Sequence, residues 1–230
     1  MAQENAYGSI FVDRIRVAKL TTAGAPSAGA SNGYASDAQI QVNWSTVIEA
    51  GAEGVQKNGS GTTCTQFKVP DSVKRVDLSI ELCKLDSALL ALLTQGDTFE
   101  DAGGGGLVIG GQLPLSTTEL NVPLCLEVWT RAWDGAQQAV PTFTDPDGAY
   151  WHYVFPLCHF VPGATTLDSG IHIFPVTGTS EENANITANG PFNDWPAEIA
   201  GEGGVTASAG WFLDEVLPTA AGIIAVPSGS

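Results

Sequence analysis

The stretch Val76–Leu93 reads VDLSIELCKLDSALLALL and holds the two patterns that predict the fold. Apolar residues occupy every second position from Val76 to Leu82, and this period of two predicts a β-strand with one buried face. A leucine-rich run then follows Asp86, a residue type that favours the N-cap of a helix. We therefore expect one α-helix from about residue 86 to 95, ended by Gly96.

The alternation of apolar and polar residues recurs outward from this stretch in both directions. We expect further strands over residues 10–20, 39–44, 124–129, 150–160 and 170–178, separated by clusters of Gly, Pro, Asn and Asp. A second short helix is expected to start at Asp194, with Pro196 in its first turn. Antiparallel strands with one packed helix predict a mainly β fold, an antiparallel sandwich or barrel with a flanking helix and extended arms.

The two ends of the chain differ in composition from its centre. Residues 21–34 are rich in Ala, Gly and Ser, which is typical of a flexible loop or arm. Near the C-terminus, Ile223, Ile224 and Val226 form an apolar strip that needs something to pack on, either its own domain or a neighbouring subunit. We expect an N-terminal arm with the first strand (1–35), a β domain (36–202) and a C-terminal arm (203–230), both arms being mobile in the isolated chain.

Charge excludes several kinds of partner. Nine basic residues stand against 25 acidic ones, giving a net charge of −16, and no Lys or Arg occurs after Arg131. Such a surface repels phosphate, so clamping of nucleic acid and binding to anionic membranes are disfavoured. No run of about 18 apolar residues predicts a transmembrane helix, and the first residues lack the features of a signal peptide.

The candidate motifs for chemistry have simpler explanations. Gly103–Gly106 lacks the Lys and Ser/Thr of a phosphate-binding loop, and Asp145–Gly148 fits a hairpin turn better than a calcium loop. His152, His159 and His172 show no metal-binding spacing. On one regular strand His152 and His159 face opposite sides, so we interpret the histidines as ordinary strand residues.

Cysteines and aromatic residues complete the candidates. Cys125 and Cys158 lie in apolar strands and are expected to be buried, whereas Cys64 and Cys83 could pair or stay reduced. One aromatic set could form a sugar-binding platform, although a core and its rim is the commoner role. Its members are Trp129, Trp133, Tyr150, Trp151, Tyr153 and Phe155. We expect no catalytic residue, no metal and no cofactor.

Five stretches, in this order, carry a resemblance to a known family. They are Val76–Leu93, Leu126–Thr130 (LEVWT), Trp151–Gly163 (WHYVFPLCHFVPG), Ser169–Asn183 (SGIHIFPVTGTSEEN) and Gly190–Pro196 (GPFNDWP). Together they resemble the major tail protein of long-tailed phages that infect actinobacteria. Members often carry a Cys-Gly-x-Pro segment near the N-terminus, whereas residues 21–31 here keep Gly24 and Pro26 without a Cys.

The resemblance implies a structural virion protein without enzymatic activity. In that family the subunits join edge to edge into hexameric rings, and the rings stack into a tail tube through which the genome passes. It implies other tail proteins as partners (terminator, tape measure and tip) and DNA as non-specific cargo, with synthesis in the host cytoplasm. The alternatives are another virion β-protein, such as a head-decoration or tail-terminator subunit, and a carbohydrate-binding β-sandwich.

Two sets of residues are the candidates for function within this interpretation. Asp77, Ser79 and Glu81 share the non-core face of one strand, and we expect them to line the channel, because a wall of like charge repels DNA. An outward acidic surface is the alternative for this face. Ile223, Ile224 and Val226 are expected to form the arm between subunits.

Overall fold

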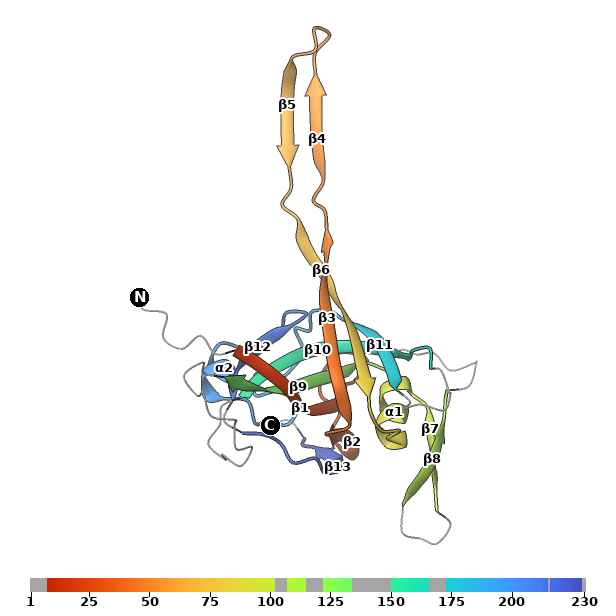
Figure 1. The fold of residues 1–230 in the computed structure, drawn as a ribbon. Coiled ribbons are helices and arrows are strands. Elements are labelled where there is room, and N and C mark those ends of the chain that lie inside the picture. The colour runs from red at the N-terminus through yellow and green to blue at the C-terminus, as the bar shows by residue number, and fades with distance from the viewer. Residues whose placement is uncertain are drawn as a thin grey trace.

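The protein is mainly β, with one large antiparallel sheet (Figure 1). The computed structural model describes residues 8–101, 107–114, 122–133, 150–165, 173–214 and 216–228. In chain order its elements are β1 (Gly8–Lys19), β2 (Gly29–Ser36), β3 (Gln39–Glu49), β4 (Glu53–Lys57), β5 (Thr63–Lys68), β6 (Ser72–Leu82), α1 (Ser87–Thr94), β7 (Asp97–Glu100), β8 (Val108–Gln112), β9 (Leu124–Trp133), β10 (Tyr150–Pro162), β11 (Phe174–Ser180), α2 (Ala197–Gly201), β12 (Gly210–Asp214) and β13 (Gly222–Val226).

Nine strands make the large sheet in the order β13-β2-β1-β9-β10-β11-β6-β3, with β12 pairing beside β10. Two small sheets, β4-β5 and β7-β8, complete the described strands. The path of the large sheet ends at β13 and β3, so these described strands do not close into the barrel that was one of our two expectations. The Gln39 side-chain amide donates to the backbone oxygen of Val12 at 3.2 Å, which brings β3 close to β1 without pairing them.

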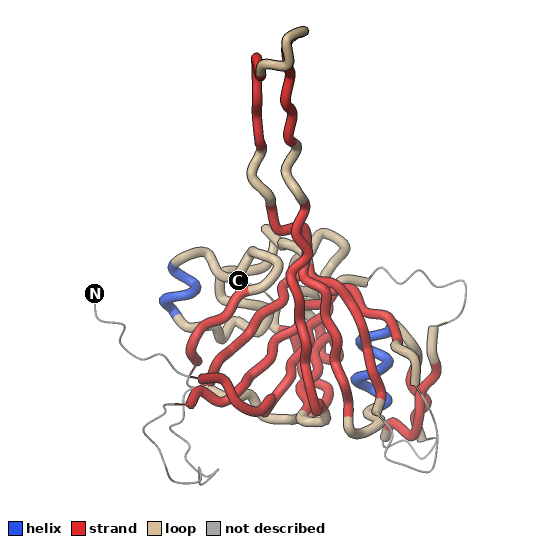
Figure 2. The backbone as a smooth tube through the Cα atoms, turned by 45° about the horizontal axis from the view of Figure 1, so that its top comes forward, coloured by secondary structure: helices blue, strands red, loops and turns tan. Residues whose placement is uncertain are grey.

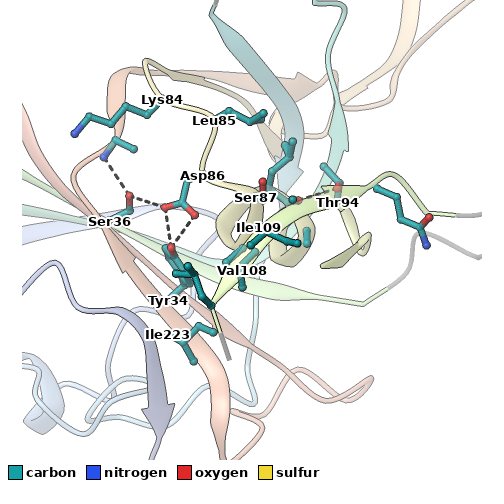
Figure 3. A pocket seen from close by; sticks show the side chains of 18 of the residues that line it. Tyr34, Ser36, Lys84, Leu85, Asp86, Ser87, Thr94, Val108, Ile109 and Ile223 are labelled. Carbon is teal, nitrogen blue, oxygen red and sulfur yellow. Dashed lines mark hydrogen bonds between the residues drawn. The ribbon is translucent and has the colours of Figure 1, made fainter. Parts of the chain in front are cut away.

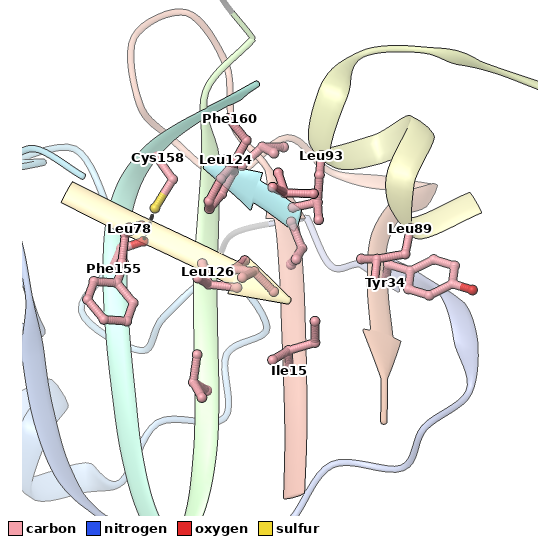
Figure 4. Packing of buried hydrophobic residues seen from close by; sticks show 14 of the residues in the cluster. Ile15, Tyr34, Leu78, Leu89, Leu93, Leu124, Leu126, Phe155, Cys158 and Phe160 are labelled. Carbon is pink, nitrogen blue, oxygen red and sulfur yellow. Dashed lines mark hydrogen bonds between the residues drawn. The ribbon is translucent and has the colours of Figure 1, made fainter. Parts of the chain in front are cut away.

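The main core lies on one face of this sheet (Figure 4). It contains Ile15 from β1 and Ile80 from β6, although β9, β10 and β11 separate these two strands in the sheet. The sheet is therefore bent so that both of its halves share one cluster. Helix α1 covers one end of this cluster with Leu89 and Leu93, both fully buried.

A second, smaller core lies on the opposite face of β1, β9 and β10. Its members are Ala18, Leu20, Cys125, Val154, Ile186, Trp195, Phe212 and Val226. The last four belong to the C-terminal part of the chain, which covers this half of the sheet. The other half, formed by β11, β6 and β3, keeps a polar outer face.

A long hairpin projects from one end of the molecule (Figures 1 and 2). Strands β3 and β6 pair from Gln39↔Leu82 to Glu49↔Ser72, and β4 and β5 continue the hairpin beyond the body. The connection stays ordered because the Gly51 amide donates to Asp71 at 2.9 Å and Val69 donates to Ala52 at 2.8 Å. We name residues 45–75 the projecting hairpin.

The helices confirm the sequence patterns with shifted ends. Asp86 caps α1 and accepts from the Leu89 amide at 3.1 Å, as expected. The helix ends at Gln95, which takes the left-handed conformation in place of Gly96. Helix α2 starts at Ala197 rather than at Asp194, because the Asp194 carboxylate binds Arg16 and does not cap the helix.

Both segments that we expected as mobile arms pair with the sheet. Strand β2 pairs with β1 through Ile15–Ala18, and β13 pairs with β2. Strand β12 pairs with β10. The difference has a physical reason, since Tyr34 joins the main core and Phe212 and Val226 join the second core, whereas Ile223 stays exposed.

Some smaller expectations differ from the structure, and others fall on residues that the structure does not describe. A β-bulge between Phe155 and Cys158 shifts the alternation of β10, so His152 and His159 lie on the same face and not on opposite faces. Strand β11 covers Phe174–Ser180, later than expected. Gly103–Gly106, Asp145–Gly148, His172 and the side chain of Trp133 lie outside the described residues. No helix of the described chain is long and apolar enough to span a membrane.

Candidate functional site

The polar face of β6 is formed as the alternation predicts. Asp77, Ser79 and Glu81 are half-buried on one face, while the four apolar residues between and beside them point into the main core. Because β6 lies between β11 and β3, these three residues are on an interior strand of the sheet and not on an edge strand. The channel-lining role of the three residues stays a prediction.

Neighbouring strands extend this polar face on both sides. On β3 the paired residues are Gln41, Asn43 and Ser45, and on β11 they include Thr177 and Thr179. Arg75 donates to Asp77 at 2.8 Å, so Asp77 is a paired charge whereas Glu81 has no ion-pair partner among the described residues. The face is thus hydroxyl- and amide-rich with a weak negative charge.

The projecting hairpin carries a surface unlike the rest of the molecule. Its exposed apolar side chains are Ile48, Val55, Phe67, Val69 and Val73. Within residues 45–75, three acids stand against four bases, a net charge of +1, so the rest of the chain carries −17. An isolated two-stranded hairpin is marginal in water, and apolar groups displayed on one gain from a partner surface.

A groove with apolar walls and several polar lining residues, which we name the apolar groove, is seen in Figure 3; the elements that bound it lie at the end of the molecule opposite the projecting hairpin in Figure 1. Its volume is about 950 Å³, and it is bounded by α1, β8 and β13. Ile109 and Ile223 face it with more than half of their surface exposed. At its floor the Tyr34 hydroxyl donates to Asp86 at 2.7 Å; burial and this carboxylate raise the pKa of Tyr34 above its ordinary value.

The predicted arm residues border this groove or support it. Ile223 pairs with Tyr34 of β2 and is exposed, Ile224 is half-buried, and Val226 is buried in the second core. Strands β13 and β3 end the path of the sheet, and β12, which pairs only with β10 among the described strands, is a further edge strand. A role of Ile223, Ile224 and Val226 between subunits stays a prediction.

A buried charge network that the sequence did not reveal links the C-terminal part of the chain to the sheet. The guanidinium of Arg16 donates to Glu127 at 2.7 Å and makes a bidentate contact with Asp194. His152 places Nδ1 3.1 Å from Asp214 and Nε2 3.3 Å from Glu127. Arg16, Glu127 and His152 are all buried, in contrast to Asp194, whose side chain is 47% exposed.

Two indoles complete this network. Trp195 Nε1 donates to Glu127 at 2.7 Å, and Trp129 Nε1 donates to Asp214 at 3.2 Å. The ring of Trp129 stacks on His152 at 3.9 Å between centroids. Each carboxylate oxygen of Glu127 and Asp214 accepts a hydrogen bond, whereas His152 Nε2 contacts Glu127 at 3.3 Å without a hydrogen-bond partner among the described residues. The described residues contain no group of three or more side chains suited to a metal ion.

The electrostatics of the network follow from its geometry. Burial by itself raises the pKa of Glu127, but Arg16 and His152 outweigh burial and hold this pKa at about 2. Burial likewise opposes the charged form of His152, and the carboxylates of Asp214 and Glu127 outweigh it and raise the pKa of His152. The same His152 contact lowers the pKa of Asp214 against burial. Each of these shifts favours the charged form of its group.

The cysteines and the aromatic set divide between the cores and the surface. Cys125 and Cys158 are fully buried, as expected, and burial raises the pKa of Cys158 to about 12. Cys64 and Cys83 are exposed and free, which excludes the pairing left open from the sequence. Trp129 and Phe155 are buried on opposite faces of the sheet, so the described members of the aromatic set form no common platform.

Two comparisons with known proteins were made. A scan against models of protein families and a search of curated proteins both found no match.

Proposed function

We propose that the chain is a structural subunit of a phage tail tube, in which hexameric rings stack into the channel for genome delivery. The observation that carries the proposal is the placement of the projecting hairpin and the apolar groove at opposite ends of the molecule. Such a pair of surfaces is heterologous: the hairpin of one copy fits the groove of the next, and repetition builds a stack. The resemblance of the five sequence stretches to actinobacteriophage major tail proteins supports the same function.

The distribution of net charge and the edge strands of the sheet also support the proposal. The hairpin carries +1 and faces copies whose remaining surface carries −17, which favours contact between unlike parts of two copies over contact between like parts. Within a ring, the edges β3 and β13 offer backbone groups to neighbouring copies, and joining them removes the exposed edges of the sheet. The polar face around Glu81 would then form the channel wall.

A complementation experiment tests the stacking contact. One variant replaces residues 50–71 by an Asn-Gly turn, which joins the paired residues Glu49 and Ser72 in a short hairpin. A second variant changes Ile109→Asp and Ile223→Asp in the groove. We expect wild-type protein to form tubes under negative-stain microscopy and each variant alone to stop at rings or single subunits.

Mixing the two variants gives the sharper result. The first keeps the groove and the second keeps the hairpin, so the mixture is expected to form stacks of limited length, whereas either variant alone forms none. Tubes of normal length from the hairpin-deleted variant would contradict the stacking contact. A wild-type chain that stays a monomer at high concentration and is retained on a polysaccharide column would instead favour a carbohydrate-binding module.

A further inference from the structure

The C-terminal strap, which we define as residues 181–214 and 216–226, lies over the outer face of β1, β9 and β10. Its apolar contacts come from Ile186, Trp195, Phe212 and Val226 in the second core. Strands β12 and β13 pair with β10 and β2, and Asn183 donates to Gly24 and Pro156. The charged contacts of the strap with the sheet go to the buried charge network, through Asp194 and Asp214, and Trp195 donates to the same network. The strap is therefore fastened by groups whose charge depends on pH.

His152 lies between two carboxylates, which favours its doubly protonated form, although only Nδ1 has a hydrogen-bond partner among the described residues. Nδ1 faces Asp214 of β12 at 3.1 Å and Nε2 faces Glu127 of β9 at 3.3 Å, so a carboxylate oxygen stands at each ring nitrogen. A neutral imidazole has a proton on one nitrogen and a lone pair on the other. In either tautomer, one lone pair would point at a buried carboxylate oxygen.

The other groups around His152 do not relieve this conflict. Arg16 of β1 is held by Glu127 and Asp194. From β9, Trp129 stacks on the ring, and its indole N–H is already directed at Asp214. Phe212 of β12 contacts the ring from the strap. The buried thiol of Cys125 beside Glu127 has a raised pKa, so it stays neutral and adds no charge.

The numbers of cations and carboxylates in the cluster also favour the protonated form of His152. Arg14 lies on the same face of β1 as Arg16, and its Nε and Nη1 have no hydrogen-bond partner among the described residues. With His152 charged, Arg16 and His152 stand against the carboxylates of Glu127, Asp194 and Asp214. Loss of one proton from His152 leaves those three carboxylates with Arg16 alone as a directly bonded cation.

We propose that the C-terminal strap is a releasable cover whose lock is the protonated His152 held between Asp214 and Glu127, and that loss of this proton detaches β12 from β10. The raised pKa of His152 sets the direction: the lock is complete below the ordinary histidine pKa of roughly 6.5 and opens as pH rises through the higher pKa of the folded state. Release uncovers Cys125 and the edge of β10 from Tyr150 to Val154. The proposal does not depend on the chain forming a tube.

Hydrogen exchange of the full chain at pH 6 and pH 9, corrected for the intrinsic effect of pH on exchange, tests the lock. We expect protection of the β12 amides to fall at least tenfold between these values, while protection of β6 stays constant. His152→Gln can donate to only one of the two carboxylates, so its β12 protection is expected to be low at both pH values. His159→Gln, on the same face of the same strand, is the matched control and is expected to behave as wild type.

Thiol labelling gives a readout in the wild-type chain that needs no variant to fold. Cys125 lies under the strap and Cys158 lies in the main core, so strap release exposes Cys125 alone. We expect the ratio of Cys125 to Cys158 labelling to rise at least tenfold from pH 6 to pH 9. A ratio and a β12 protection that do not change with pH would overturn the proposal, as would a loss of protection in His159→Gln equal to that in His152→Gln.

Discussion

Arg16 shows how one buried residue sets the stability of the outer face of the sheet. Its guanidinium bridges Glu127, which is fully buried, and Asp194, which is about half exposed. Solvent screens the contact with Asp194, so most of the energetic consequence of losing Arg16 comes from Glu127. A buried carboxylate without its cation costs more than the pair contributes, because the desolvation of the remaining charge is no longer compensated.

We expect Arg16→Ala to lower the free energy of unfolding by about 3–5 kcal/mol, the range for breaking a buried ion pair from one side. Arg16→Lys keeps the charge but loses the bidentate geometry, and its effect is expected to be intermediate. Urea denaturation followed by far-UV circular dichroism measures both. The matched control is Arg75→Ala, which removes an exposed pair with Asp77 and is expected to leave the midpoint unchanged; equal losses at Arg16 and Arg75 would refute the argument.

The carboxylates of the network predict the acid limb of stability. The pKa values of Glu127 and Asp214 are lowered in the folded chain, to about 2 for Glu127, so the stabilisation from these two groups is present above the ordinary carboxyl pKa of roughly 4 and is lost as pH falls toward 2. We expect the free energy of unfolding to decrease steadily from pH 4.5 to pH 2. Glu127→Gln is expected to be less stable at pH 6 and to show a shallower decrease, measured by urea denaturation across this range.

At the scale of elements, α1 depends on a single carboxylate. Asp86 accepts from the Leu89 amide of the first turn and from the Tyr34 hydroxyl of β2, so it caps the helix and ties it to the sheet. We expect Asp86→Ala to cost about 1–2 kcal/mol, typical of a lost N-cap, and Tyr34→Phe about 1 kcal/mol or less. Thermal denaturation of both variants and the double variant gives the coupling.

The coupling free energy between these two substitutions shows whether the Asp86 carboxylate serves the helix cap and the contact with β2 together. If Asp86 serves both donors, the double variant loses less stability than the sum of the two single variants. Asp97→Ala is the control, since Asp97 is an exposed aspartate whose side chain accepts from Gln112 on the neighbouring strand β8. Strict additivity of the Asp86 and Tyr34 effects would show that the cap and the tie to β2 are independent.

The elements also show where sequence patterns suffice and where they fail. Strand β6 and helix α1 were predictable because local alternation and an N-cap residue fix them. The projecting hairpin was missed, since both faces of β4 and β5 meet solvent and leave no alternation to detect. The charge network was missed because its partners are far apart in sequence. The available signal was Glu127, a charged residue within the otherwise apolar run from Leu124 to Trp129.

At the scale of the whole molecule, charge is divided between two regions. The strap covers one half of the outer face of the sheet, where Asp194 and Asp214 pair with Arg16 and His152, whereas β11, β6 and β3 leave a polar face open. In the proposed tube this open face forms the wall of the channel. A negatively charged wall repels duplex DNA, which carries about one charge per 1.7 Å of its axis, and so keeps the genome free to move.

Charge reversal on β6 tests this division. Asp77→Lys with Glu81→Lys changes two half-exposed residues whose backbone pairing stays intact, so we expect tubes to assemble. Inside a channel the new lysines contact phosphates and release counterions, and the tubes are expected to retain DNA at low salt and to release it as salt rises. The matched control, Glu198→Lys with Glu202→Lys, makes the same change of charge at α2 and is expected to bind DNA without enclosing it. Nuclease protection separates the two cases, because DNA within a channel is resistant and DNA on an outer surface is digested. Equal digestion in both variants would place Asp77 and Glu81 on the outside of the tube.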